Sequence, residues 1–73
     1  MIRFYIKERI ADKEFKEGRR ITIEEIVKET GVSRPTLSRM INTKGYKAST
    51  DVLDKLCRYF DCKLSDLTEY IKD

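Results

Sequence analysis

Residues 22–42 read TIEEIVKETGVSRPTLSRMIN, and this stretch decides the fold. Its first half begins with Thr22 at an N-cap position and Glu25 three residues later, which is the spacing of a capping box. Gly31 can adopt the left-handed backbone conformation that ends a helix, because it has no Cβ atom. The pattern therefore predicts a short helix over residues 23–30.

A second helix is expected directly afterwards, over residues 34–42. Ser33 stands at its N-cap, and Pro35 falls in the first turn, where the missing N–H of proline costs nothing. Leu37 and Met40 lie where the two helices must touch. Two short helices joined by a glycine-containing turn form a helix-turn-helix. The second helix then displays, away from the core, Arg34, Pro35, Ser38 and Arg39.

Charge is distributed unevenly along the chain, although the net charge of its 73 residues is only +3. Residues 1–29 hold eight basic and seven acidic side chains, and residues 51–73 hold four basic and six acidic ones. Residues 30–50 hold four basic side chains and no acidic one. Such a window favours a polyanion such as nucleic acid as the partner. The alternative is chance clustering of solvated surface charge.

Three further helices are expected around this pair. Apolar periodicity predicts a first helix over about residues 6–15, with Gly18 well placed to end it. A later helix is capped by Ser49 or Thr50, and a short last helix is capped by Ser65 or begins just before it. The buried stripe of the later helix is expected to hold Val52, Leu53, Leu56, Cys57 and Phe60.

The two ends of the chain are expected to form short strands. Ile2, Phe4 and Ile6 alternate with polar residues, which is the period of a strand. The only other β-like piece is residues 69–72, so we expect the two ends to pair. The alternative is that residues 1–5 extend the first helix.

Length and composition exclude several classes of protein. Seventy-three residues are expected to form a single domain, over residues 1–73. No apolar run approaches the ~20 residues of a membrane-spanning helix. Histidine is absent, and Cys57 and Cys62 are two ligands where structural zinc normally needs four. We read both cysteines as reduced thiols of a cytoplasmic protein, and we expect no catalytic residue, no metal site and no cofactor.

Three segments resemble one family of regulators. Residues 30–39, TGVSRPTLSR, look like the recognition segment of the Cro/Xre family, the lambda-repressor-like DNA-binding domains. Residues 45–47 followed by 50–62 resemble the fourth helix of its small members, and residues 67–71 resemble their C-terminus. The resemblance implies a compact all-α fold of five helices, with the third helix in the major groove of DNA.

The resemblance also assigns roles to individual residues. Positions that read bases match Arg34, Pro35 and Arg39, with Ser38 between them. Arginine can bond the O6 and N7 atoms of guanine, although ordinary solvated arginines are the alternative. The phosphate contacts are expected from Ser33, Thr36, Asn42, Lys44 and Lys47. Thr22 is expected to make a further contact, because a helix N-terminus can accept a phosphate. Tyr46 is expected to make another, and the alternative for Tyr46 is packing against the core. For Lys44 and Lys47 the alternative is generic loop charge. The connection from Lys13 to Ile21 is expected to be longer than in the smallest members.

We therefore expect a sequence-specific binder of double-stranded DNA that regulates transcription, most simply a repressor that occupies its operator. A homodimer that is weak in solution and stronger on DNA is expected, because one recognition helix covers too few base pairs. The first rival is an antitoxin-like regulator whose main partner is another protein. The second rival is a protein-interaction module that kept the fold and lost DNA binding.

Overall fold

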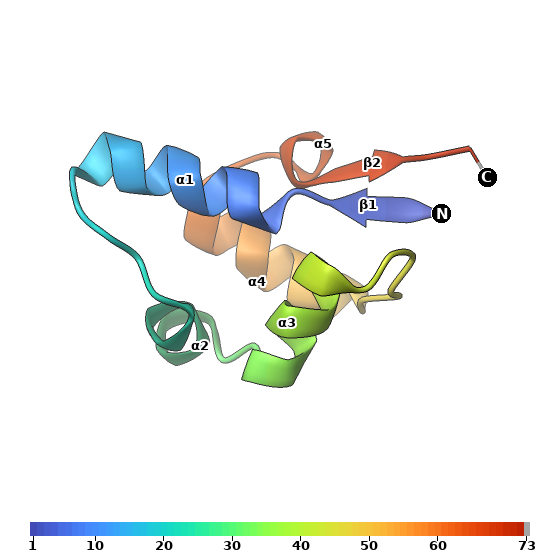
Figure 1. Ribbon diagram of the computed structural model, residues 1–73, viewed down its shortest axis with the longest axis horizontal. Coiled ribbons are helices and arrows are strands. Elements are labelled where there is room, and N and C mark those ends of the chain that lie inside the picture. The colour runs from blue at the N-terminus through green and yellow to red at the C-terminus, as the bar shows by residue number, and fades with distance from the viewer. Residues whose placement is uncertain (73) are drawn as a thin grey trace.

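The structure is a computed structural model that describes residues 1–72, and it contains five helices flanked by two short strands (Figure 1). The expected all-α, five-helix architecture with paired ends is confirmed. Within the described residues, no helix has both the length and the hydropathy to cross a membrane. In chain order the elements are β1 (Ile2–Phe4), α1 (Ile6–Glu17), α2 (Ile23–Thr30), α3 (Arg34–Asn42), α4 (Thr50–Phe60), α5 (Leu64–Leu67) and β2 (Thr68–Tyr70).

Side-chain caps and left-handed residues set the ends of the helices. The hydroxyls of Thr22 and Ser33 accept hydrogen bonds from the N–H groups of Glu25 and Thr36, at 3.2 and 3.3 Å. Gly31 ends α2 in the left-handed conformation, at φ 77°. These bonds fix where α2 and α3 begin and how sharply the chain turns between them.

Several sequence-based details need correction. The capping box at Thr22 is only half formed, because the Glu25 carboxylate binds Arg19 instead of the Thr22 N–H. The first helix runs to Glu17, so the connection to α2 is shorter than the expected segment from Lys13 to Ile21. Of the two starts expected for α5, the cap at Ser65 is wrong and the start just before Ser65 is confirmed, with Lys63 as the N-cap.

The core joins all five helices through one fully buried side chain from each. These side chains are Ile6, Ile26, Leu37, Leu56 and Leu67. The expected stripe of α4 is less enclosed than predicted, since Leu56 alone in it is fully buried and its other four members are half-buried. A chain of this size buries only about 60% of its unfolded surface, so few positions can lie wholly inside.

The chain ends pair as predicted, and residues 1–5 do not extend α1. β1 and β2 are antiparallel, with Ile2 opposite Tyr70 and Phe4 opposite Thr68. The Tyr5 N–H donates to the carbonyl of Leu67 at 2.8 Å. The resulting β-ribbon, the pair of strands β1 and β2, projects beyond α1 and lies beside the loop between α3 and α4 (Figure 1).

Truncating the core residue of α3 tests this packing. Leu37 is fully buried, so Leu37→Ala should lower the free energy of unfolding by about 2–5 kcal/mol. Phe15 on α1 is 79% exposed, so Phe15→Ala should change it by no more than about 0.5 kcal/mol. Urea unfolding monitored by circular dichroism measures both. Equal effects of the two substitutions would contradict the placement of α3.

Candidate nucleic-acid interface

α3 has a buried side and an exposed side. Leu37 and Met40 are buried, and they anchor the helix to the core. The four residues predicted to read bases all lie on the exposed side, and the structure therefore brings them together on one helix. They are Arg34, Pro35, Ser38 and Arg39.

The N-terminus of α3 is better suited to an anion than that of α2. No acidic residue lies in the first turn of α3, whereas Glu24 and Glu25 occupy the first turn of α2. Partial positive charge at a helix N-terminus attracts phosphate, and nearby carboxylates oppose it. Ser33 donates its hydroxyl proton to the Thr36 hydroxyl oxygen at 2.8 Å, which leaves the Thr36 proton available to an acceptor. The Thr22 hydroxyl faces a less favourable field.

Arg34 is held by an ion pair that the sequence analysis missed. Its Nη1 atom lies 2.6 Å from Oε1 of Glu24, and the two side chains are 66% and 62% exposed. The pKa of Glu24 is lowered, first by a hydrogen bond from its own backbone and then by the charge of Arg34. The ion pair therefore holds the Arg34 guanidinium against Glu24 of α2.

The loop after α3 carries the other predicted phosphate contacts. Asn42, Lys44 and Lys47 are exposed, and the Asn42 amide lies 3.4 Å from the Ser38 hydroxyl. Tyr46 is half-buried against the core, which favours packing as its main role. The phosphate contact predicted for Tyr46 thus has weaker support than those of its exposed neighbours.

Most of the cations on this side of the molecule lack acidic partners among the described residues. Within residues 1–72, Arg39, Lys44 and Lys47 form no ion pair, whereas Arg34 pairs with Glu24. Lys55 of α4, by contrast, is paired with Asp51 one helical turn away. The acid-free window seen in the sequence therefore corresponds to unneutralised charge on the surface of α3 and its loop.

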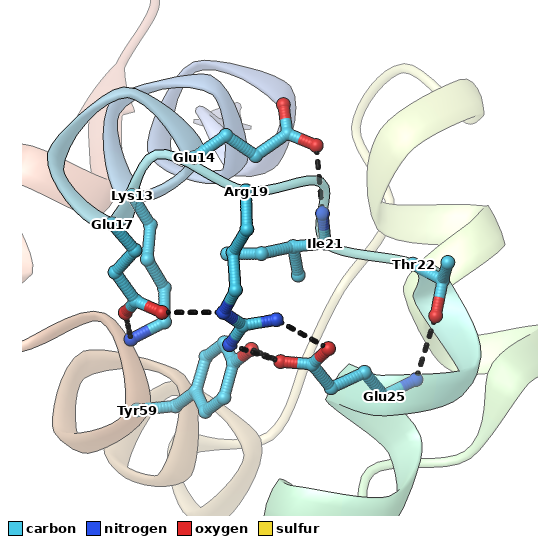
Figure 2. Close-up of polar contacts among 8 residues, drawn as sticks. All are labelled: Lys13, Glu14, Glu17, Arg19, Ile21, Thr22, Glu25 and Tyr59. Atoms are coloured by element: carbon cyan, nitrogen blue, oxygen red, sulfur yellow. Dashed lines mark hydrogen bonds and ion pairs between the residues drawn. The ribbon is translucent and has the colours of Figure 1, made fainter.

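A polar cluster connects α2 of the helix-turn-helix with its neighbours in the fold (Figure 2). Arg19, in the connection from α1, donates to both carboxylate oxygens of Glu25 at 2.8 and 2.7 Å and to Glu17 at 2.9 Å. The Tyr59 hydroxyl of α4 lies 3.5 Å from Glu25, and Lys13 of α1 pairs with Glu17 at 2.8 Å. The cluster thus links α1, α2 and α4.

This cluster shifts the pKa values of its members. The hydrogen bonds from Arg19 are the main reason why the pKa of Glu25 lies below its usual range. The Glu25 carboxylate, in turn, raises the pKa of Arg19. Both shifts favour the charged forms, so the pair stays ionised at neutral pH.

Comparison with known families decides what this arrangement is. A model of the Cro/C1-type HTH DNA-binding domain matches residues 6–73. The chain belongs to this family. No curated protein and no solved structure matches the chain.

Membership of this family indicates which helices form the DNA-binding motif. In this Cro/C1-type domain, α2 and α3 form the helix-turn-helix, and the exposed side of α3 is the candidate surface for DNA. The roles of individual side chains stay predictions. Residue spacing in the sequence did not predict two contacts of this surface. They are the ion pair of Glu24 with Arg34 and the hydrogen bonds from Arg19 to Glu25 of α2.

Acid should weaken the Cro/C1-type domain partly through Glu25. Its folded-state pKa is lowered, so its contribution to stability is present above the ordinary glutamate pKa of about 4.3 and is lost as the pH falls through the folded value. We expect Glu25→Gln to flatten the decline of the free energy of unfolding below that pH. Glu29→Gln is the control, because Glu29 is exposed on the same helix and forms no ion pair within residues 1–72. Urea titrations at several pH values measure the slopes, and equal slopes in both variants would refute the role given to Glu25.

Proposed function

We propose that this protein is a cytoplasmic, sequence-specific regulator of transcription that represses by occupying an operator in double-stranded DNA. The observation that supports the proposal most is the exposed side of α3, which carries Arg34 and Arg39 opposite a buried Leu37 in a chain of a DNA-binding family. Occupancy needs no chemistry from the protein, since a bound domain excludes other proteins from the same DNA.

Base reading would come from α3 in the major groove. Arg39 has no acidic partner within residues 1–72, so its guanidinium can bond the O6 and N7 atoms of a guanine without giving up an ion pair. Arg34 would exchange Glu24 for a base, and breaking that ion pair reduces its net contribution. Pro35 and Ser38 lie on the same side and would contact neighbouring base edges.

Phosphate contacts would orient α3 on the duplex without reading sequence. The N-terminus of α3 supports one contact, through backbone N–H groups and the hydroxyls of Ser33 and Thr36. The loop supports a second set through Asn42, Lys44 and Lys47, all exposed. We keep Thr22 and Tyr46 as further candidates, with weaker support because of the acids beside Thr22 and the packing of Tyr46.

Removal of either arginine should relax base preference. After selection of bound sites from a random DNA pool, Arg34→Ala and Arg39→Ala should each cost about 1–3 kcal/mol of specific binding and relax the preference at one base pair. Fluorescence anisotropy with the selected operator and its single-base variants measures both effects. Lys16→Ala on α1 is the control, since Lys16 is 75% exposed and pairs with Asp12. Unchanged specificity in the double variant would overturn the assignment.

Glu24→Gln provides a reciprocal control for Arg34. It removes the partner of Arg34 together with a negative charge near the DNA, so operator binding should tighten. In the Arg34→Ala background the same substitution should have a smaller effect. Equal effects in both backgrounds would show that Glu24 acts by its charge alone.

The loop lysines should contribute to affinity on any sequence. We expect Lys44→Ala and Lys47→Ala to weaken binding to operator and random DNA about equally. Each should reduce the slope of log affinity against log salt by roughly one unit for each phosphate that is no longer neutralised. Lys55→Ala is the control, because Lys55 pairs with Asp51 on α4. Weaker binding to the operator alone would contradict the phosphate role.

We also propose that two copies bind two half-sites about 10 base pairs apart. β1 and β2 pair with each other and leave one outer edge each; the candidate surface for the contact between copies is the edge of β2, beside Leu64 and Tyr70, which are 53% and 68% exposed. Sedimentation should detect mostly monomer in free solution and two copies on the operator. One copy on an unrepeated half-site, with no second copy at higher concentration, would contradict the dimer.

A further inference from the structure

A groove of about 500 Å³ lies between β1, the end of α3 and the loop that follows it. One wall consists of residues 1–4 of the strand segment, with Lys7 and Glu8 from α1. The other wall consists of residues 40–45, and Ile71 lines it from beyond β2. We call this feature the β1 groove. Figure 1 shows its surroundings, where the ribbon passes beside the α3–α4 loop.

The strand presents an unpaired backbone edge to this groove. Met1 exchanges both backbone hydrogen bonds with Ile71, at 2.9 and 2.8 Å, and the Tyr5 N–H bonds to Leu67. Backbone groups of an antiparallel strand alternate in direction, so those of Ile2 and Phe4 point away from β2. No hydrogen bond from another part of residues 1–72 reaches them there. Four consecutive residues of this segment line the groove, so it follows the free edge.

The side chains of the groove combine an apolar wall with positive charge. Met40 is buried, and Ile41 and Phe4 are half-buried beside it. Arg3, Lys7 and Lys44 line the groove against one carboxylate, that of Glu8. None of these three cations forms an ion pair within residues 1–72, although Glu69 lies opposite Arg3 on β2.

We propose that the β1 groove binds an extended acidic segment of a partner protein, which adds to β1 as a third strand. The N–H and C=O groups of Ile2 and Phe4 would bond its backbone. Alternate side chains of the segment would face Phe4 and Ile41, and its acidic side chains would face Arg3, Lys7 and Lys44. The volume of the groove is in the range of ~300–1,000 Å³ that is usual for binding sites.

The composition of the groove distinguishes this occupant from two others. A nucleic-acid backbone offers phosphates for the cations but no N–H donors for the carbonyls of Ile2 and Phe4. It also offers no apolar side chain that would pack against the apolar wall. In a second copy, the edge of β1 lies in the same groove, beside its own α3–α4 loop. A free extended segment therefore enters the groove more easily than a folded domain does.

Occupation of the groove would also affect DNA, a consequence that rests on the proposed function. Asn42 and Lys44 line the groove and are also proposed phosphate contacts. An acidic segment bound there would neutralise Lys44 and repel the DNA backbone. Peptide and DNA would therefore weaken each other's binding by the same factor.

The experiment uses the full chain without DNA, so its outcome does not depend on the proposed function. The probe is a capped seven-residue peptide that alternates valine and glutamate, titrated while amide chemical shifts are recorded. We expect saturable shifts at residues 2–4 and 41–45. A peptide with N-methyl groups on alternate amides should bind about fivefold more weakly for each hydrogen bond removed. A lysine-for-glutamate peptide should not bind.

Variants of the protein make the test specific. Ile2→Pro removes an outward N–H without touching the β1–β2 hydrogen bonds, and it should weaken peptide binding about fivefold, whereas Ile2→Val should not. The amide spectrum verifies that each variant is folded. Arg3→Ser and Lys7→Ser should weaken binding of the acidic peptide and leave the fold intact.

Four results would overturn the proposal. The first is no shift at millimolar peptide, and the second is equal binding of the N-methylated peptide. The third is a change in the amide chemical shifts of residues 2–4 on addition of a random-sequence DNA duplex, with no change on addition of peptide; this result would assign the groove to DNA. The fourth is a loss of self-association on Ile2→Pro with no peptide binding, which would assign it to a second copy.

Discussion

Burial of Leu37 and Met40 is the constraint on which the candidate surface for DNA depends. An α-helix of nine residues has one side against the core, so anchoring these two side chains turns Arg34, Ser38 and Arg39 to solvent. Ile26 of α2 is buried in the same cluster, and Gly31 permits the sharp turn between the two helices. The recognition surface is thus a consequence of how the core is filled.

Electrostatics adds a second level of organisation. Acidic residues begin α2, where Glu25 is bound by Arg19 and Glu24 by Arg34, and after Glu29 at the end of α2 no acid follows until α4. Glu24 and Glu25 are thus paired with arginines, while Arg39 and the loop lysines stay free of acidic partners within residues 1–72. The arrangement holds α2 in place and leaves a positive surface in front of it.

The bounds of α2 and α3 could be predicted from nearby residues in the sequence. Several contacts between residues farther apart in the chain could not be predicted from the sequence. Ser33, Pro35 and Gly31 act within one turn of the chain, so the bounds of α2 and α3 followed directly from the sequence. The pairing of Glu24 with Arg34 depends on the angle between two helices, which no spacing rule contains. Likewise, Arg3 and Lys7 lie near Lys44 because the fold places β1 and the start of α1 beside the loop after α3, whereas the charge count assigned them to a nearly neutral segment.

The proposed function places the exposed side of α3 in the major groove of DNA, where it reads guanine. Dimethyl sulfate methylates guanine N7 in the major groove and adenine N3 in the minor groove, so a protection experiment on a selected operator tests this placement directly. We expect protection of guanine N7 in each half-site and loss of protection at one guanine per half-site in Arg39→Ala. Protection confined to adenine N3, or guanine protection that persists in the Arg34→Ala, Arg39→Ala double variant, would contradict it.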